Sequence, residues 1–138
     1  GVGQASNTEI DRFGILPATR LAVSRALEEL STKPDHLLVD YITLPDNPLP
    51  QTRLVKGDAR SISIAAASIL AKTHRDSFMI QAAESYAGYG FAENMGYGTA
   101  FHRNSIQEIG PCPLHRLSFA PLRKQIETSE NRQLNLDL

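Results

Sequence analysis

The sequence predicts an α/β fold, in which a sheet is flanked by helices, and three observations lead to it. A strand, a turn and a long Ala-rich helix follow one another over residues 54–76. The apolar run over residues 36–40 has the length and the bounding turn residues of a buried parallel strand. A segment of helical periodicity precedes that run. The 138 residues, 41% of them hydrophobic, suit one globular domain.

The N-terminal part predicts a strand followed by helix. Residues 1–5 are small and apolar, and we interpret them as the end of a strand. The run Ser6-Asn7-Thr8 offers helix caps, with Glu9 and Asp11 in the first turn, where carboxylates favour the positive end of the helix dipole. Pro17 fits the first position of the main helix, which residues 33–35 then end.

The middle of the chain predicts two further strands and the longest helix. Residues 36–40 form a strand parallel to the first, and a loop with three prolines leads to a third strand over residues 51–55. After the turn Lys56-Gly57-Asp58, a helix continues to about Tyr86. Its N-terminal half is poor in bulk, so it can lie very close to a sheet or another helix; the small residues are Ala65, Ala66, Ala67, Ser68 and Ala71.

A Gly- and aromatic-rich loop follows, over residues 88–91 and 96–99. Flexible backbone beside exposed rings suits contact with a sugar or a base. On these residues alone, the alternative that the rings cover the core is favoured. Residues 100–109 predict a short helix. The domain extends over residues 1–126, and we expect residues 127–138 to form a flexible polar tail.

Composition excludes several classes of function. No apolar run approaches the roughly 20 residues of a membrane helix, so we expect no membrane association. The single cysteine, Cys112, excludes an internal disulfide and does not argue against a reducing cytoplasm. Glycine motifs for dinucleotides or nucleotide phosphates are lacking, and the four histidines have no zinc spacing. Net charge is −1, but residues 51–126 carry +4, which predicts either a basic face for a polyanion or a solvated surface.

Two predicted strands end near aspartates, Asp40 and Asp58. On neighbouring strands these carboxylates would converge, and a divalent cation would remove their repulsion. Hard oxygen ligands in small number suit magnesium or manganese, as in metal-assisted phosphodiester hydrolysis. The alternative is that each aspartate is only a cap or a turn residue. Ser68 similarly is either a packing residue or a phosphate contact.

Several motifs, in order and in spacing, resemble the ribonuclease HII family from about Gly1 to Pro121. They are Gly3-Gln4-Ala5-Ser6 with Glu9-Ile10-Asp11, Ala18-Thr19, Leu38-Val39-Asp40, Val55-Lys56-Gly57-Asp58, Ala65-Ala66-Ala67-Ser68-Ile69-Leu70-Ala71-Lys72, Arg75-Asp76, Gly96-Tyr97-Gly98-Thr99 with His102, and His115-Arg116 with Ser118-Phe119. The resemblance implies an RNase H-like mixed sheet with a helical C-terminal extension. It also implies a cytoplasmic endonuclease that cuts the RNA strand of RNA–DNA hybrids, and cuts 5′ of ribonucleotides embedded in a DNA duplex, using Mn²⁺ or Mg²⁺.

The resemblance also implies roles for individual residues. Asp40 looks like the third metal-ligand carboxylate and Asp58 like the fourth active-site carboxylate. Tyr97 resembles the tyrosine that stacks on the sugar at the RNA-to-DNA junction. Four further residues are implied as substrate or phosphate contacts, namely Lys56, Ser68, Lys72 and His102. Five are implied mainly in structural hydrogen bonds and ion pairs: Asp11, Arg75, Asp76, His115 and Arg116.

The sequence departs from the family pattern in two places, and these departures affect the predicted activity. The family's first motif, an Asp-Glu pair followed by a Gly-Arg-Gly turn, has no counterpart here, so we expect a chain that lacks the N-terminal third and its strands. Tyr41 stands where the family often has glycine. The complete protein would be a monomer that hydrolyses phosphodiesters with two metals. The alternative is a non-catalytic remnant that only binds nucleic acid.

Overall fold

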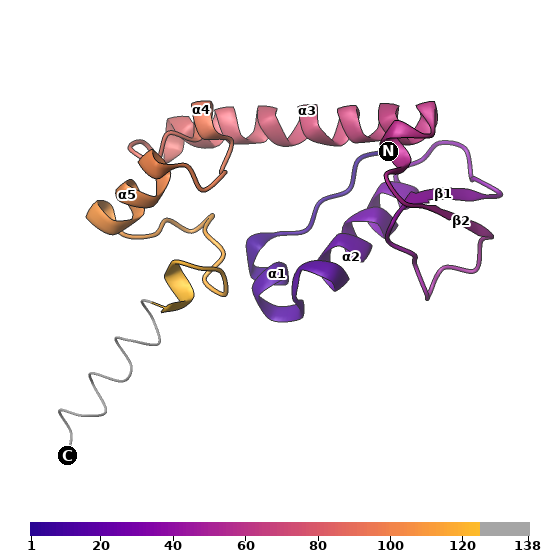
Figure 1. Cartoon of the computed structure of the whole chain (residues 1–138), viewed down its shortest axis with the longest axis horizontal. Coiled ribbons are helices and arrows are strands. Elements are labelled where there is room, and N and C mark those ends of the chain that lie inside the picture. Colours follow the sequence, from indigo (N-terminus) through magenta and orange to yellow (C-terminus); the bar gives the residue numbers. More distant parts are fainter. Residues whose placement is uncertain (125–138) are drawn as a thin grey trace, which may run out of the picture.

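The computed structural model describes residues 1–124, so the expected tail over residues 127–138 lies outside the described part. The long helix α3 (Ile62–Ser85) runs along one side of the molecule (Figure 1). The two strands and helix α2 lie toward its N-terminal end, whereas α4 and α5 lie at its C-terminal end. The predicted α/β class is confirmed, with helix predominating over a small sheet.

The described sheet has two strands, β1 (Leu37–Asp40) and β2 (Gln51–Leu54). They are parallel, with Leu37 opposite Gln51 and Asp40 opposite Leu54. The Pro-rich loop between them is fixed by one side chain, because the Gln51 amide accepts from Leu44 N–H at 2.9 Å and donates to the Leu44 carbonyl at 2.7 Å. Because the strands are parallel, their carboxyl ends lie at the same end of the sheet, which we call the sheet edge.

The strand predicted over residues 1–5 is wrong, and so is its pairing with β1. Among the described residues this segment has no strand partner, and a strand requires one for its backbone hydrogen bonds. It packs along α2 instead. A Cβ at Gly1 would lie 2.1 Å from the carbonyl oxygen of Ala26, and one at Gly3 would lie 2.0 Å from that of Ala22. Glycine is required there for close packing on a helix.

Two helices follow, α1 (Asn7–Phe13) and α2 (Ile15–Glu28). Ser6 caps α1 as predicted, in a reciprocal capping box with Glu9. The prediction that Pro17 starts the main helix is wrong, because Gly14, with φ of 83°, is the junction and Pro17 is the third residue of α2. Proline is tolerated there because the first N–H groups of a helix have no partner within it.

Helix α3 begins after Ser61, whose hydroxyl caps it. Ile64 is buried against the turn that follows β2, but the expected close packing of the Ala-rich half is not found among the described residues. Ile62 is 91% exposed and Ile69 is 67% exposed. The N-terminal half of α3 therefore buries little apolar surface.

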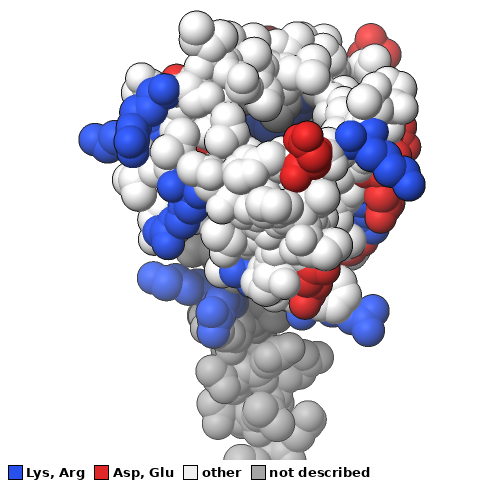
Figure 2. All heavy atoms as spheres, turned by 90° about the vertical axis from the view of Figure 1, so that its right-hand side faces the viewer, with Lys and Arg blue, Asp and Glu red and all other residues white. Residues whose placement is uncertain are grey.

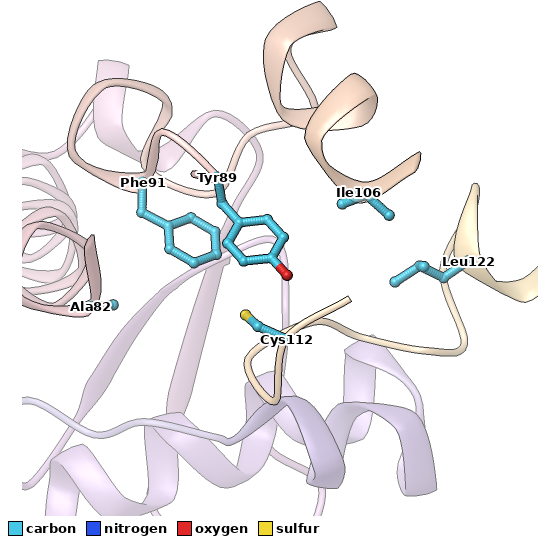
Figure 3. Packing of buried hydrophobic residues seen from close by; sticks show 6 residues of the cluster. All are labelled: Ala82, Tyr89, Phe91, Ile106, Cys112 and Leu122. Atoms are coloured by element: carbon cyan, nitrogen blue, oxygen red, sulfur yellow. The ribbon is translucent and has the colours of Figure 1, made fainter. Parts of the chain in front are cut away.

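The core lies at the other end of α3, between α4 (Phe91–Asn94), α5 (Ala100–Ile109) and the C-terminal segment. Figure 3 shows Tyr89 and Phe91 side by side between α3 and α5, with Cys112 facing them. Their rings stack with centroids 5.4 Å apart. The predicted bounds of the helix over residues 100–109 are confirmed. No helix among residues 1–124 is both long and apolar enough to cross a bilayer.

Candidate functional site

Asp40 is held in place at the carboxyl end of β1. Its Oδ1 accepts a hydrogen bond of 2.9 Å from the N–H of Gly57, which follows β2. The fit is tight, because a Cβ at Gly57 would lie 2.7 Å from Cδ1 of Ile64 and 3.3 Å from that same Oδ1. Gly57 therefore links the end of β1 to the turn after β2, a role that the sequence reasoning missed.

Asp58 follows directly, in the 3-10 turn η1 (Gly57–Ala59). Its Oδ1 accepts from the N–H of Ala59 at 2.9 Å. Both Asp40 and Asp58 are exposed, and the second oxygen of each carboxylate makes no hydrogen bond within residues 1–124. The structure thus brings the two predicted aspartates to one edge of the sheet, each with an accessible oxygen.

The chemistry of this pair suits a hard divalent cation. Magnesium keeps several waters and commonly takes one or two carboxylates plus phosphate oxygens from its substrate. In the described part of the chain, no three His, Cys, Asp or Glu residues gather as a metal site. A cation held by Asp40 and Asp58 would need its remaining ligands from water, phosphate or other protein groups.

The residues that flank the aspartates have unusual backbone conformations. Lys56 has φ of 54° and Tyr41 has φ of 64°, a left-handed region that favours glycine. Tyr41 directly follows Asp40, and the guanidinium of Arg53 lies over its ring, 4.5 Å from the centroid. The ring is 61% exposed, so it lies beside the aspartates without being packed into the core.

Ser68 and Lys72 lie on exposed turns of α3. Lys72 is not a free cation, because its ammonium pairs with the carboxylate of Asp76 one turn later. This hydrogen bond lowers the pKa of Asp76, and a second one from Arg75 acts in the same direction against a partial cost of burial. Any phosphate contact by Lys72 would therefore compete with Asp76.

Tyr97 lies in the turn between α4 and α5, where it is 57% exposed. The expected flexible backbone is instead held by hydrogen bonds. Asn94 accepts from Gly96 N–H through its side chain and from Tyr97 N–H through its carbonyl, both at 2.8 Å. Asn94 itself is buried, and its amide donates to the Tyr89 carbonyl at 2.7 Å. The sequence reasoning missed Asn94, although an Asn two residues before a glycine in a loop is a typical turn residue.

The rings of this loop divide between two roles. Tyr89 and Phe91 are buried, as the alternative interpretation predicted, and only Tyr97 offers an exposed ring. His102 is buried as well: its Nδ1 bonds the Tyr89 carbonyl at 3.1 Å and its ring stacks on His115 with centroids 5.2 Å apart. The structure therefore places His102 beneath the loop and away from the aspartates of β1 and η1.

The structural role predicted for Asp11 is confirmed. Its carboxylate accepts from the N–H groups of Leu117 at 2.8 Å and Ser118 at 3.1 Å, which ties α1 to the C-terminal segment. Burial opposes ionisation of Asp11, but the hydrogen bonds from Ser118 and Leu117 outweigh it and lower its pKa.

A groove of about 1020 Å³ separates the N-terminal segment from the C-terminal elements. Gln4, Arg75 and Tyr97 are among its lining residues, whereas Asp40 and Asp58 are not. The end of the molecule that bears the strands carries basic and acidic side chains interspersed (Figure 2). On that face the solvated-surface interpretation of the charge is favoured over a continuous basic face.

Comparison with known proteins gives a consistent result. The family model described as Ribonuclease HII matches residues 2–122. A ribonuclease HII from Dehalococcoides mccartyi is 52% identical over 127 residues, which are 92% of this chain and 60% of the relative. Those from Geobacillus sp. and Staphylococcus aureus strain Newman are 51% and 53% identical, covering 92% and 88% of this chain but 46% and 47% of the relatives. The chain thus spans about half the length of such curated relatives.

Proposed function

The chain belongs to the ribonuclease HII family, and we propose that it acts as an endonuclease on RNA–DNA hybrids and on DNA duplexes with embedded ribonucleotides. Cleavage falls on the RNA strand of the hybrid and on the 5′ side of an embedded ribonucleotide. We also propose that the protein works as a monomer in the cytoplasm. The buried free thiol of Cys112 agrees with a reducing compartment.

One observation carries this proposal: Asp40 and Asp58 lie at the same sheet edge, linked through Gly57. Open α/β sheets bind their ligands at the carboxyl ends of the strands, and Asp40 is the last residue of β1, while Asp58 lies in the turn that follows β2. The hydrogen bond from Gly57 fixes Oδ1 of Asp40 and leaves its other oxygen accessible, which is the arrangement a metal ligand needs.

We propose Asp40 and Asp58 as the residues of this chain that hold Mn²⁺ or Mg²⁺. When bound, such a cation would polarise the scissile phosphate and lower the pKa of an attacking water. A mechanism with two metals needs more ligands than these two carboxylates, and further acidic groups would complete it. The role of this chain's residues is to present both carboxylates at fixed positions on one edge.

Contacts with the nucleic acid are proposed for exposed residues near the two aspartates, along α3 and in the loop at the C-terminal end of α3. Tyr97 offers a ring for stacking on a sugar. Lys56 adjoins Asp58, and Ser68 and Lys72 lie on exposed turns of α3, so their side chains are accessible to phosphates. His102 enters the proposal as support for the Tyr97 loop, because its buried ring bonds the Tyr89 carbonyl.

A cleavage assay tests the proposal. The substrates are a DNA duplex with one ribonucleotide and a matched all-DNA duplex, each with Mn²⁺ and then Mg²⁺. Cleavage of the first duplex alone, on the 5′ side of the ribonucleotide, with the cut abolished by Asp40→Asn, would support the proposal. Equal cleavage by wild type and Asp40→Asn would contradict the assignment of Asp40.

A second candidate function is nucleic-acid binding without turnover. It is favoured by the finding that no third acidic or metal-binding side chain joins Asp40 and Asp58 within residues 1–124. A duplex affinity that falls with salt, in a folded sample that cuts neither substrate, would support this candidate over the first.

A further inference from the structure

Arg75 contacts Tyr97 in two ways. From α3, its guanidinium lies over the Tyr97 ring, 4.4 Å from the centroid. Its Nη1 also donates to the Tyr97 hydroxyl at 2.9 Å. One face of the ring and its polar end are therefore both in contact with the same side chain, while Tyr97 as a whole residue remains 57% exposed.

The orientation of Arg75 is itself fixed by its neighbour on the helix. Its Nη2 donates to Oδ1 of Asp76 at 3.1 Å, and the other oxygen of Asp76 pairs with Lys72. The third donor, Nε, is buried and has no hydrogen-bond partner among the described residues. A buried donor without a partner is costly, so the guanidinium is held by its contacts with Tyr97 and Asp76 at the expense of Nε.

The ring of Tyr97 has little else to fix its direction. Gly96 and Gly98 flank it and contribute no side chains, and Gly96 has φ of 75°. The bonds made by Asn94 and Arg103 hold the backbone of the turn and do not reach the ring. Arg75 is the described residue that touches both the face and the hydroxyl of Tyr97.

We infer that Arg75 is a positioning residue, which covers one face of the Tyr97 ring and holds its hydroxyl so that the opposite face is ready to stack on a nucleotide sugar. This inference rests on the proposed function, because it assigns Arg75 to the ribonucleotide contact of the same site. A ring held in advance loses less conformational freedom on binding, so affinity for the correct nucleotide rises.

The test compares the binding preference of each variant. This preference is the ratio of its affinity for a DNA duplex with one ribonucleotide to its affinity for an all-DNA duplex. The variants are Arg75→Gln, Arg75→Lys, Tyr97→Ala and the double variant Arg75→Gln/Tyr97→Ala. Arg12→Gln is the matched control, since Arg12 also lies over an exposed ring, 5.0 Å from the Phe13 centroid, but on α1. Urea unfolding of each variant confirms that the samples are folded.

We expect Arg75→Gln to reduce the preference about tenfold, which is less than the roughly 10²-fold that a misplacement of 1 Å can cost. Arg75→Lys keeps the charge but cannot cover the ring and bond the hydroxyl together, so it should not restore the preference. The double variant should be no worse than Tyr97→Ala, because Arg75 acts through Tyr97. Arg12→Gln should equal wild type.

A spectroscopic measurement tests the contact without substrate. In the free chain, the side-chain protons of Arg75 should be shifted upfield by the Tyr97 ring, and Tyr97→Ala should remove that shift. Full preference in Arg75→Gln, full rescue by Arg75→Lys or additive losses in the double variant would overturn the inference alone. A wild-type chain without any preference would overturn the proposed function and this inference with it.

Discussion

Two substitutions of Asp40 distinguish the contribution of its hydrogen bond from the contribution of its charge. Asp40→Ala removes the acceptor of the 2.9 Å hydrogen bond from Gly57, a residue that is itself buried. Leaving a buried backbone N–H without a partner costs about 1–3 kcal/mol. Because the Asp40 side chain is exposed, water can partly replace the acceptor, and we expect a loss of about 1–2 kcal/mol in the free energy of unfolding.

Asp40→Asn keeps an oxygen where Oδ1 accepts from Gly57, and it removes only the negative charge. We therefore expect the free energy of unfolding to change by less than about 0.5 kcal/mol, the usual range for a surface substitution. Urea unfolding followed by circular dichroism measures both variants, with equal m-values required for the comparison. If Asp40→Ala is as stable as Asp40→Asn, the link between Asp40 and Gly57 does not contribute as we reason.

Three further variants test other parts of the structure. Gly3→Ala should lower the free energy of unfolding by about 1–3 kcal/mol in urea, because its Cβ would meet the Ala22 carbonyl oxygen at 2.0 Å; stability equal to wild type would contradict the packing on α2. Asn94→Ala should cost about 2 kcal/mol in the same measurement, since the Gly96 N–H loses its partner and the buried Tyr89 carbonyl keeps only the hydrogen bond with His102; an unchanged midpoint would refute this role. The Arg25 and Ser6 hydrogen bonds lower the pKa of Glu9 from 4.5 to about 2, so the stabilisation that Glu9 gives is complete above pH 4.5 and is lost as the pH falls through about 2. The melting temperature of Glu9→Gln should therefore be lower than that of wild type at pH 6, and the difference should shrink toward pH 2; a constant difference would contradict the assignment.

The sequence predicted elements whose signals are local. Thr99 caps α5 and Gly110 follows its end, so both ends of this helix were correct. The positions of the two strands were also correct, and Asp40 is the last residue of β1, but the predicted burial of β1 is wrong, because Leu38 is 47% exposed. Cap and turn residues determine where these elements begin and end, and packing against the rest of the fold does not change those positions.

Other features depend on contacts between distant residues and could not be predicted. Residues 1–5 are small and apolar, as the residues of a strand can be, but their glycines allow the backbone to pack closely against α2. Nothing local distinguishes Tyr89, which is buried, from Tyr97, which is exposed, since both stand between glycines. The burial of His102 likewise follows from the packing of α5 on the loop, which its sequence spacing does not show.

The most direct test of the central claim is manganese binding, followed by the loss of the free Mn²⁺ signal in electron paramagnetic resonance. Our account predicts that the wild-type chain binds Mn²⁺ and that Asp40→Asn and Asp58→Asn each weaken binding about tenfold or more, since each removes a charged ligand of the same site. Asp40→Asn is the stricter comparison, because we expect it to keep the hydrogen bond from Gly57. Equal Mn²⁺ affinity in wild type and both variants would show that these two carboxylates do not share a metal site.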